Sequence, residues 1–163
     1  MKEFIKIPQE RIPVLIGTEG TVKKELEKRT RTKITITDEI EIEGETFDVM
    51  LAANVVKAIS RGFSPENAFL LLDEEHELNV ITLSGQSERT VKRLMGRVIG
   101  RQGRTRRKIE EMCGAKISIY GKTVAIIART AELETASRCM EMLLKGRTHG
   151  YVYHFLEDMK NKR

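Results

Sequence analysis

The chain has 163 residues, with 29 lysines and arginines against 24 acidic residues, a formal net charge of +5 and a sequence pI near 9.3. This length allows one domain or two small domains, and the basic balance favours a polyanionic partner. Cys113 and Cys139 have neither the number nor the spacing of a disulfide framework or zinc site. We therefore expect reduced, buried thiols in a cytoplasmic protein without metal or cofactor. No apolar run approaches the length of a membrane span, so no membrane partner is expected.

The first half of the chain alternates between patterns typical of strands and of helices. Residues 4–7 predict a strand that ends at Pro8, and residues 9–16 predict a short helix. Pro13 either lies in the opening turn of that helix or disturbs it. The further elements expected here are a helix after Gly20, strands at 33–37 and 40–44, and a helix at 49–59. Together they predict a first domain over residues 1–62.

A helical connector is expected between the two halves, over residues 63–76. Ser64 and Pro65 have the form of an N-cap followed by the first helical residue. Apolar residues then follow on one side of the expected helix, which is unlike a flexible Gly/Ser linker.

The second half repeats the alternation and predicts a domain over residues 77–146. Ser87 is the expected N-cap of a helix at 88–99, and Gly114 is expected to end a helix at 104–113. Gly121-Lys122 predicts the two-residue turn of a β-hairpin. The other elements expected are strands at 78–83, 115–120 and 123–128, a helix at 131–144, and a C-terminal helix within 147–163.

A Gly-x-x-Gly turn, Gly100-Arg101-Gln102-Gly103, lies between two of the expected helices. Its glycines allow a sharp turn and a close approach of another backbone, and the next helix begins there with free N–H groups. From Arg89 to Lys108 the chain carries many basic residues and no acidic residue. This combination predicts an anion with repeating charge, which is a nucleic-acid backbone.

The same turn has an earlier counterpart, Gly17-Thr18-Glu19-Gly20. The two copies align without a gap from Leu15 to Ile36, a stretch that includes Leu26-Glu27 over Ile109-Glu110. The chain therefore reads as two copies of one supersecondary unit. Glu19 places a carboxylate where the second copy has Gln102, and this carboxylate would repel a phosphate.

The second unit closely resembles a type I KH domain. The resemblance rests on Val98 to Gly103, on Ile109, on Gly114 to Ile117, and on the order of elements. The first unit is a weaker match through Ile16 to Gly20 and Thr32 to Ile34. The resemblance implies an α+β protein of two tandem β-α-α-β-β-α domains, each with a three-stranded antiparallel sheet packed on helices. It also implies that about four nucleotides of single-stranded RNA or DNA are bound, with the Gly-x-x-Gly loop on the backbone.

A narrower resemblance joins residues 103–111 and 118–127 to the two-KH small-subunit ribosome assembly factors. The eukaryotic member of this family is the partner of the Nob endonuclease, and archaea have a shorter relative. The resemblance implies action near the 3′ end of the small-subunit ribosomal RNA precursor and the maturation endonuclease as a partner. No Ser-His-Asp or Cys-His arrangement is evident, so we expect an RNA-binding protein without catalytic activity.

The expected RNA contacts combine backbone N–H groups of the second loop, neighbouring cations and an apolar groove for bases. They are Arg97, Val98, Ile99, Gly100, Arg101, Gln102, Gly103, Arg104, Arg107, Lys116, Ile117 and Ile119. A secondary site, for RNA or for protein, is expected at Gly17, Thr18, Glu19, Gly20, Lys23 and Lys24.

Three questions stay open at this point. Arg106 lies where KH domains usually carry an apolar residue, and it either lies at the helix surface or reaches RNA. The chain as a whole is alternatively an accessory subunit of an RNA-degrading complex. It is also open to interpretation as a protein-interaction scaffold with incidental RNA binding.

Overall fold

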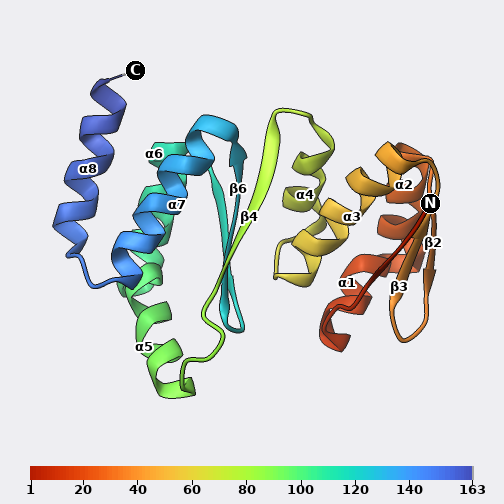
Figure 1. Ribbon diagram of the computed structural model, residues 1–163, viewed down its shortest axis with the longest axis horizontal. Coiled ribbons are helices and arrows are strands. Elements are labelled where there is room, and N and C mark those ends of the chain that lie inside the picture. The colour runs from red at the N-terminus through yellow and green to blue at the C-terminus, as the bar shows by residue number, and fades with distance from the viewer. Residues whose placement is uncertain (163) are drawn as a thin grey trace. The chain divides into compact units, whose positions relative to one another are not determined.

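The computed structural model describes residues 1–162 (Figure 1). The chain forms two compact units, Met1–Glu74 and Glu75–Arg163, and each has its own three-stranded antiparallel sheet with helices. The α+β class and the two tandem β-α-α-β-β-α units expected from the sequence are therefore confirmed. None of the helices within residues 1–162 is long and apolar enough to cross a membrane.

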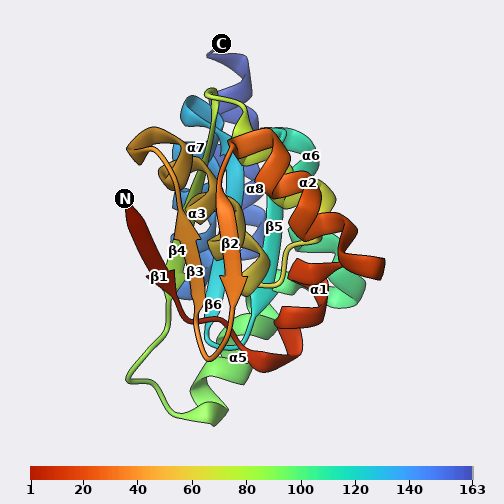
Figure 2. The ribbon, with the colours of Figure 1, turned by 90° about the vertical axis from the view of Figure 1, so that its right-hand side faces the viewer.

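The sheet of the first unit has the strand order β1-β3-β2, and Figure 2 shows the three strands side by side. Period-two alternation turns the isoleucines of these strands, such as Ile34 and Ile42, into the core, where helix α3 covers them. Pro13 lies in the opening turn of α1, where it needs no helical N–H bond. The elements are β1 (Lys2–Ile5), α1 (Ile12–Ile16), α2 (Thr21–Thr30), β2 (Lys33–Ile36), β3 (Ile40–Glu43) and α3 (Thr46–Ser60).

The segment expected as a connector is helical and packs against α3. It consists of α4 (Pro65–Ala68) and the 3-10 helix η3 (Phe69–Leu72). The side chain of Ser64 accepts a hydrogen bond from the N–H of Asn67 at 3.2 Å, as the N-cap prediction requires. Ala68 and Leu71 are buried, and the segment up to Glu74 belongs to the first compact unit.

The second unit has the strand order β4-β6-β5, so its two edge strands are β4 and β5. Ser87 caps α5 by accepting the N–H of Thr90 at 3.2 Å, and the hairpin turn between β5 and β6 lies at Gly121-Lys122 as expected. The elements are β4 (His76–Thr82), α5 (Glu88–Ile99), α6 (Arg104–Cys113), β5 (Lys116–Tyr120), β6 (Thr123–Arg129), α7 (Thr130–Leu144) and α8 (His149–Asn161).

The core of the second unit lies between its sheet and helices α5, α6 and α7. Helix α8 packs on α6 and α7 from the side away from the sheet (Figure 1). It buries Val152 and Leu156 there, so the C-terminal helix is part of this unit's core. Cys113 and Cys139 are buried thiols that form no disulfide, and burial raises the pKa of Cys139 to about 12.

Candidate nucleic-acid interface

The second Gly-x-x-Gly turn joins the end of α5 to the start of α6 through one 3-10 turn, η4 (Arg101–Gly103). Gly100 has φ 75° and ψ 175°, a conformation that side chains other than glycine's hardly ever adopt. A Cβ at Gly100 would lie 2.1 Å from the hydroxyl oxygen of Thr105. The backbone of α6 therefore comes so close to this turn that only glycine fits.

The first Gly-x-x-Gly turn has the same backbone. Gly17 has φ 75° and ψ 174°, and a Cβ there would lie 2.4 Å from a methyl carbon of Val22. Glu19 (φ 55°, ψ 27°) matches Gln102 (φ 55°, ψ 28°). The repeat expected from the sequence is thus also a repeat of loop conformation, and the two turns differ mainly in the charge of their side chains.

The tips of the second turn are open to solvent. Arg101, Gln102, Arg104 and Arg107 are exposed. The amide of Gly100 donates to the carbonyl of Gly96 at 3.0 Å, and the amide of Gly103 donates to the carbonyl of Gly100 at 3.2 Å. The two glycine amides are therefore engaged within the protein.

The apolar residues predicted to seat bases divide into two sets. Val98 and Ile117 are buried in the core beside Ile109. Ile99 is half-buried, and Ile119 is half-buried where it packs against the same core. Of the four residues predicted to seat bases, only Ile99 and Ile119 are thus partly open to a ligand.

Lys116 is exposed at the start of β5 and meets Arg107 across a hollow of about 370 Å³. Glu110 and Glu111 line the same hollow. The structure thus brings two predicted cations together, but it also places carboxylates beside them, and these offset part of the positive charge.

Arg106 and Glu110 form a hydrogen-bonded link between α6 and the edge strand β5. The guanidinium of Arg106 donates to Glu110 at 3.1 Å, and the other carboxylate oxygen of Glu110 accepts the N–H of Ile117 at 2.9 Å. The first unit repeats this hydrogen-bonded link: Glu27 accepts from Lys23 at 3.2 Å and from the N–H of Ile34 at 2.8 Å. The open question about Arg106 is therefore answered by an ion pair within the protein.

Replacing Glu110 with Ala should lower the free energy of unfolding by about 1–3 kcal/mol, because the N–H of Ile117 loses its acceptor and Arg106 its partner. The matched control is Glu111→Ala, an exposed neighbour for which we expect a change within about 0.5 kcal/mol. Urea denaturation of both variants measures the difference. If both variants lost the same free energy of unfolding, the link from Glu110 to Arg106 and Ile117 would contribute nothing to stability.

Helix α8 contacts the residues on both sides of the second turn, a role that was not predicted from the sequence. On one side, the guanidinium of Arg97 donates to the carbonyls of Leu143, at 2.9 Å, and Arg147, and His149 Nε2 lies 2.9 Å from the carbonyl oxygen of Arg97. On the other side, the hydroxyl of Tyr153 lies 3.1 Å from that of Thr105. Arg97, expected to bind RNA, thus uses Nε and Nη2 of its guanidinium to bond two backbone carbonyls.

The Gly-x-x-Gly turn of the first unit, where a secondary site is expected, is less basic than the turn of the second unit. Lys23 is paired with Glu27, and Lys24 lies close to its own loop, 3.4 Å from the carbonyl oxygen of Glu19. Thr18 and Glu19 are exposed, and they present no cation where the second turn presents Arg101.

Comparisons with known proteins match both units. Residues 75–161 match the family described as the eukaryotic type KH-domain (KH-domain type I), and residues 2–58 match the family described as the KH domain. A KH domain-containing protein of Methanocaldococcus jannaschii is 41% identical over 169 aligned residues, which cover 98% of this chain and 74% of that protein.

Two further relatives carry more specific descriptions. The pre-rRNA-processing protein pno1 of Aspergillus fumigatus is 27% identical over 113 residues, or 66% of this chain and 44% of that protein. The crystal structure of an a/eIF2alpha-aDim2p-rRNA complex from Pyrococcus horikoshii contains a chain 47% identical to this one, with a TM-score of 0.93. That match covers 100% of this chain and 96% of the other.

Proposed function

The chain belongs to the Dim2 and Pno1 family of proteins with two KH domains, and we propose on this basis that it binds single-stranded RNA during small-subunit ribosome assembly. The finer part of the proposal is a site of action near the 3′ end of the 16S ribosomal RNA precursor. The observation that carries the proposal is the glycine-constrained, cation-rich turn at Gly100 to Gly103 in a KH domain.

The turn is proposed to hold the sugar–phosphate backbone. Because the amides of Gly100 and Gly103 are engaged, donation to a phosphate is assigned to the amides of Arg101 and Gln102 between them. The exposed guanidinium groups of Arg101 and Arg104 add charge. That of Arg107 lies near the turn, 3.1 Å from where a Cβ of Gly103 would be.

Bases are proposed to lie over Ile99 and Ile119, the two partly exposed residues of the predicted groove. Val98 and Ile117 support them from the core. Arg97 acts in this proposal as a brace for the turn, through the carbonyls of Leu143 and Arg147. Lys116 stays a proposed phosphate contact at the edge of the groove.

The first unit is proposed to make protein contacts, with the maturation endonuclease as the partner suggested by the family. Its loop has the backbone of a KH loop, but Glu19 opposes a phosphate and Lys23 is already paired. The relative from Pyrococcus horikoshii was crystallised in a complex with rRNA, which supports ribosomal RNA as the ligand class of this chain. A binding role without catalysis is proposed for both units.

Binding of RNA should weaken as salt is raised, and less steeply after Arg104→Ala or Arg107→Ala. Each phosphate contact to a single strand contributes about 0.7 to the slope of log affinity against log salt, so each variant should lose about that much. Lys24→Ala, the matched position in the first unit, should leave the slope unchanged. Fluorescence anisotropy across a salt series measures the slopes. Parental slopes in both arginine variants would place these side chains on a solvated face.

A competition experiment tests the proposed function itself. The competitors are a short RNA that matches the mature 3′ end, the same RNA in a duplex, and a scrambled single strand. We expect the first to compete best, because a KH groove takes only unpaired, splayed bases. Equal competition by the duplex would refute the KH binding mode. Equal competition by the scrambled strand would refute the assigned target while leaving that mode in place.

A further inference from the structure

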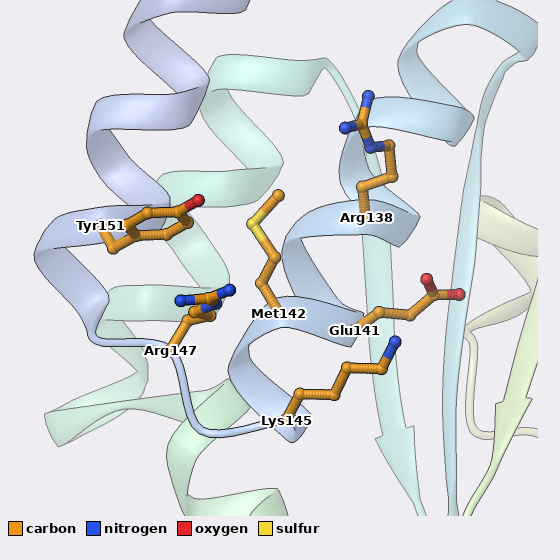
Figure 3. A pocket seen from close by; sticks show the side chains of 6 residues that line it. All are labelled: Arg138, Glu141, Met142, Lys145, Arg147 and Tyr151. Carbon is orange, nitrogen blue, oxygen red and sulfur yellow. The ribbon is translucent and has the colours of Figure 1, made fainter.

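A hollow of about 250 Å³ lies between α7 and α8, outside the groove described above. Figure 3 shows the six side chains that line it, with Met142 between Tyr151 on one side and Arg138 and Glu141 on the other. Three of the six are cations and one is an acid, so its lining has a net positive charge. The six residues are Arg138, Glu141, Met142, Lys145, Arg147 and Tyr151.

Tyr151 is 51% exposed, so its ring is open to a ligand. The guanidinium carbon of Arg147 lies 5.0 Å from the centre of its ring. Figure 3 shows this pair on the side of the hollow opposite Arg138 and Glu141. The guanidinium therefore covers one face of the ring, and an aromatic ring or a guanidinium plane with an open outer face is a surface on which an unpaired base stacks.

The hollow is connected to the second Gly-x-x-Gly turn through Arg97. This residue lies in the last turn of α5, and its guanidinium donates to the backbone carbonyls of Leu143 and Arg147. These bonds also satisfy carbonyls at the C-terminal end of α7, where bare carbonyls would repel a phosphate. The amide of Arg147, which donates to the carbonyl of Met142 at 2.9 Å, satisfies another.

We propose that the hollow between α7 and α8 binds one further nucleotide of the same RNA strand that the turn at Gly100 to Gly103 holds. Its base stacks on the Tyr151–Arg147 pair, and its phosphate lies near Lys145 and Arg147. This inference rests on the proposed function and extends it from the groove to the helical side of the second unit. RNA is favoured over an acidic protein because the hollow combines cations with an exposed aromatic ring, and because Arg97 ties Arg147 of its lining to the helix that leads into the turn.

The test compares oligouridylates of about four and about twelve nucleotides, because a KH groove holds about four. The variants are Tyr151→Ala and Arg147→Ala, both of exposed side chains, and the matched control is His154→Ala, exposed on the same helix and outside the lining of the hollow. For each protein, the ratio of the two affinities is measured by fluorescence anisotropy. Urea denaturation verifies that each variant is folded as stably as the parent.

We expect the parent and the control to bind the longer RNA more tightly by a ratio that each of the two variants reduces about tenfold, the effect of losing one stacked base. Binding of the shorter RNA should be unchanged in both variants. Parental ratios in both variants would overturn the inference and would leave the hollow to a protein partner. Failure of the parent to bind either RNA would instead refute the proposed function, so the two failures are distinguishable.

Discussion

Replacing Arg101 and Gln102 together with aspartate is expected to weaken the binding of single-stranded RNA by at least about a hundredfold. The change removes one cation and adds two carboxylates where the proposed phosphate lies. Like charges that lie next to each other in an interface cost about several kcal/mol. The free energy of unfolding should stay close to the parental value, because both side chains are exposed. Gln102 has φ 55°, and aspartate is among the residues that tolerate this conformation.

The chain offers a matched control for this variant in its first unit. Changing Thr18 and Glu19 to aspartate gives the first turn the same Gly-Asp-Asp-Gly sequence on the same backbone. We expect a much smaller loss of RNA affinity there, since that turn already carries a carboxylate. Isothermal titration with one single-stranded RNA measures both. A comparable loss in the first unit would mean that the ranking of the two units is wrong.

Gly100→Ala is expected to reduce both the stability of the second unit and its RNA binding. The new Cβ would lie 2.1 Å from the hydroxyl oxygen and 2.8 Å from the backbone nitrogen of Thr105, so α6 must shift. The conformation at φ 75° and ψ 175° adds strain for any residue with a Cβ. We expect the free energy of unfolding to fall by about 2–3 kcal/mol, since strain of this kind alone costs about 1–3 kcal/mol.

Gly103→Ala separates backbone strain from the clash with α6. Gly103 also has φ 75°, but its ψ of 12° lies in the left-handed helical region, where a Cβ costs about 1–2 kcal/mol. The nearest atom to its added Cβ belongs to the flexible end of Arg107, 3.1 Å away. Denaturant unfolding should therefore rank Gly100→Ala as the more damaging change. The opposite ranking would contradict the tight packing of α6 on the turn.

Local signals in the sequence were sufficient to predict most elements. Ser64 and Ser87 each cap the helix that the sequence predicted after them, and Gly114 ends α6. Helix α3 begins at Thr46, before the expected residue 49, because Thr46 and Asp48 are polar and Phe47 is exposed, so the buried apolar stripe starts only at Val49. Such signals are reliable where neighbouring residues alone decide the backbone conformation.

The roles of the arginines were not predictable in the same way. Arg97, Arg101, Arg104, Arg106 and Arg107 belong to one acid-free run from residue 89 to 108, and sequence reasoning placed four of the five on RNA. In the structure, Arg106 pairs with Glu110 and Arg97 with carbonyls near the start of α8. The group that a guanidinium contacts depends on the tertiary fold, and the carbonyls that Arg97 contacts belong to residues in a distant part of the chain.

By itself the sequence determined the two-unit repeat, the order of elements and the paired Gly-x-x-Gly turns, because glycine conformation, capping and apolar periodicity are local properties. Only the tertiary structure decided which strand lies in the centre of each sheet. It also decided that α8 braces the second turn through Arg97 and Tyr153, and that a basic hollow lies beside Tyr151. These features depend on contacts between segments far apart in the chain, for which a single sequence carries no local signal.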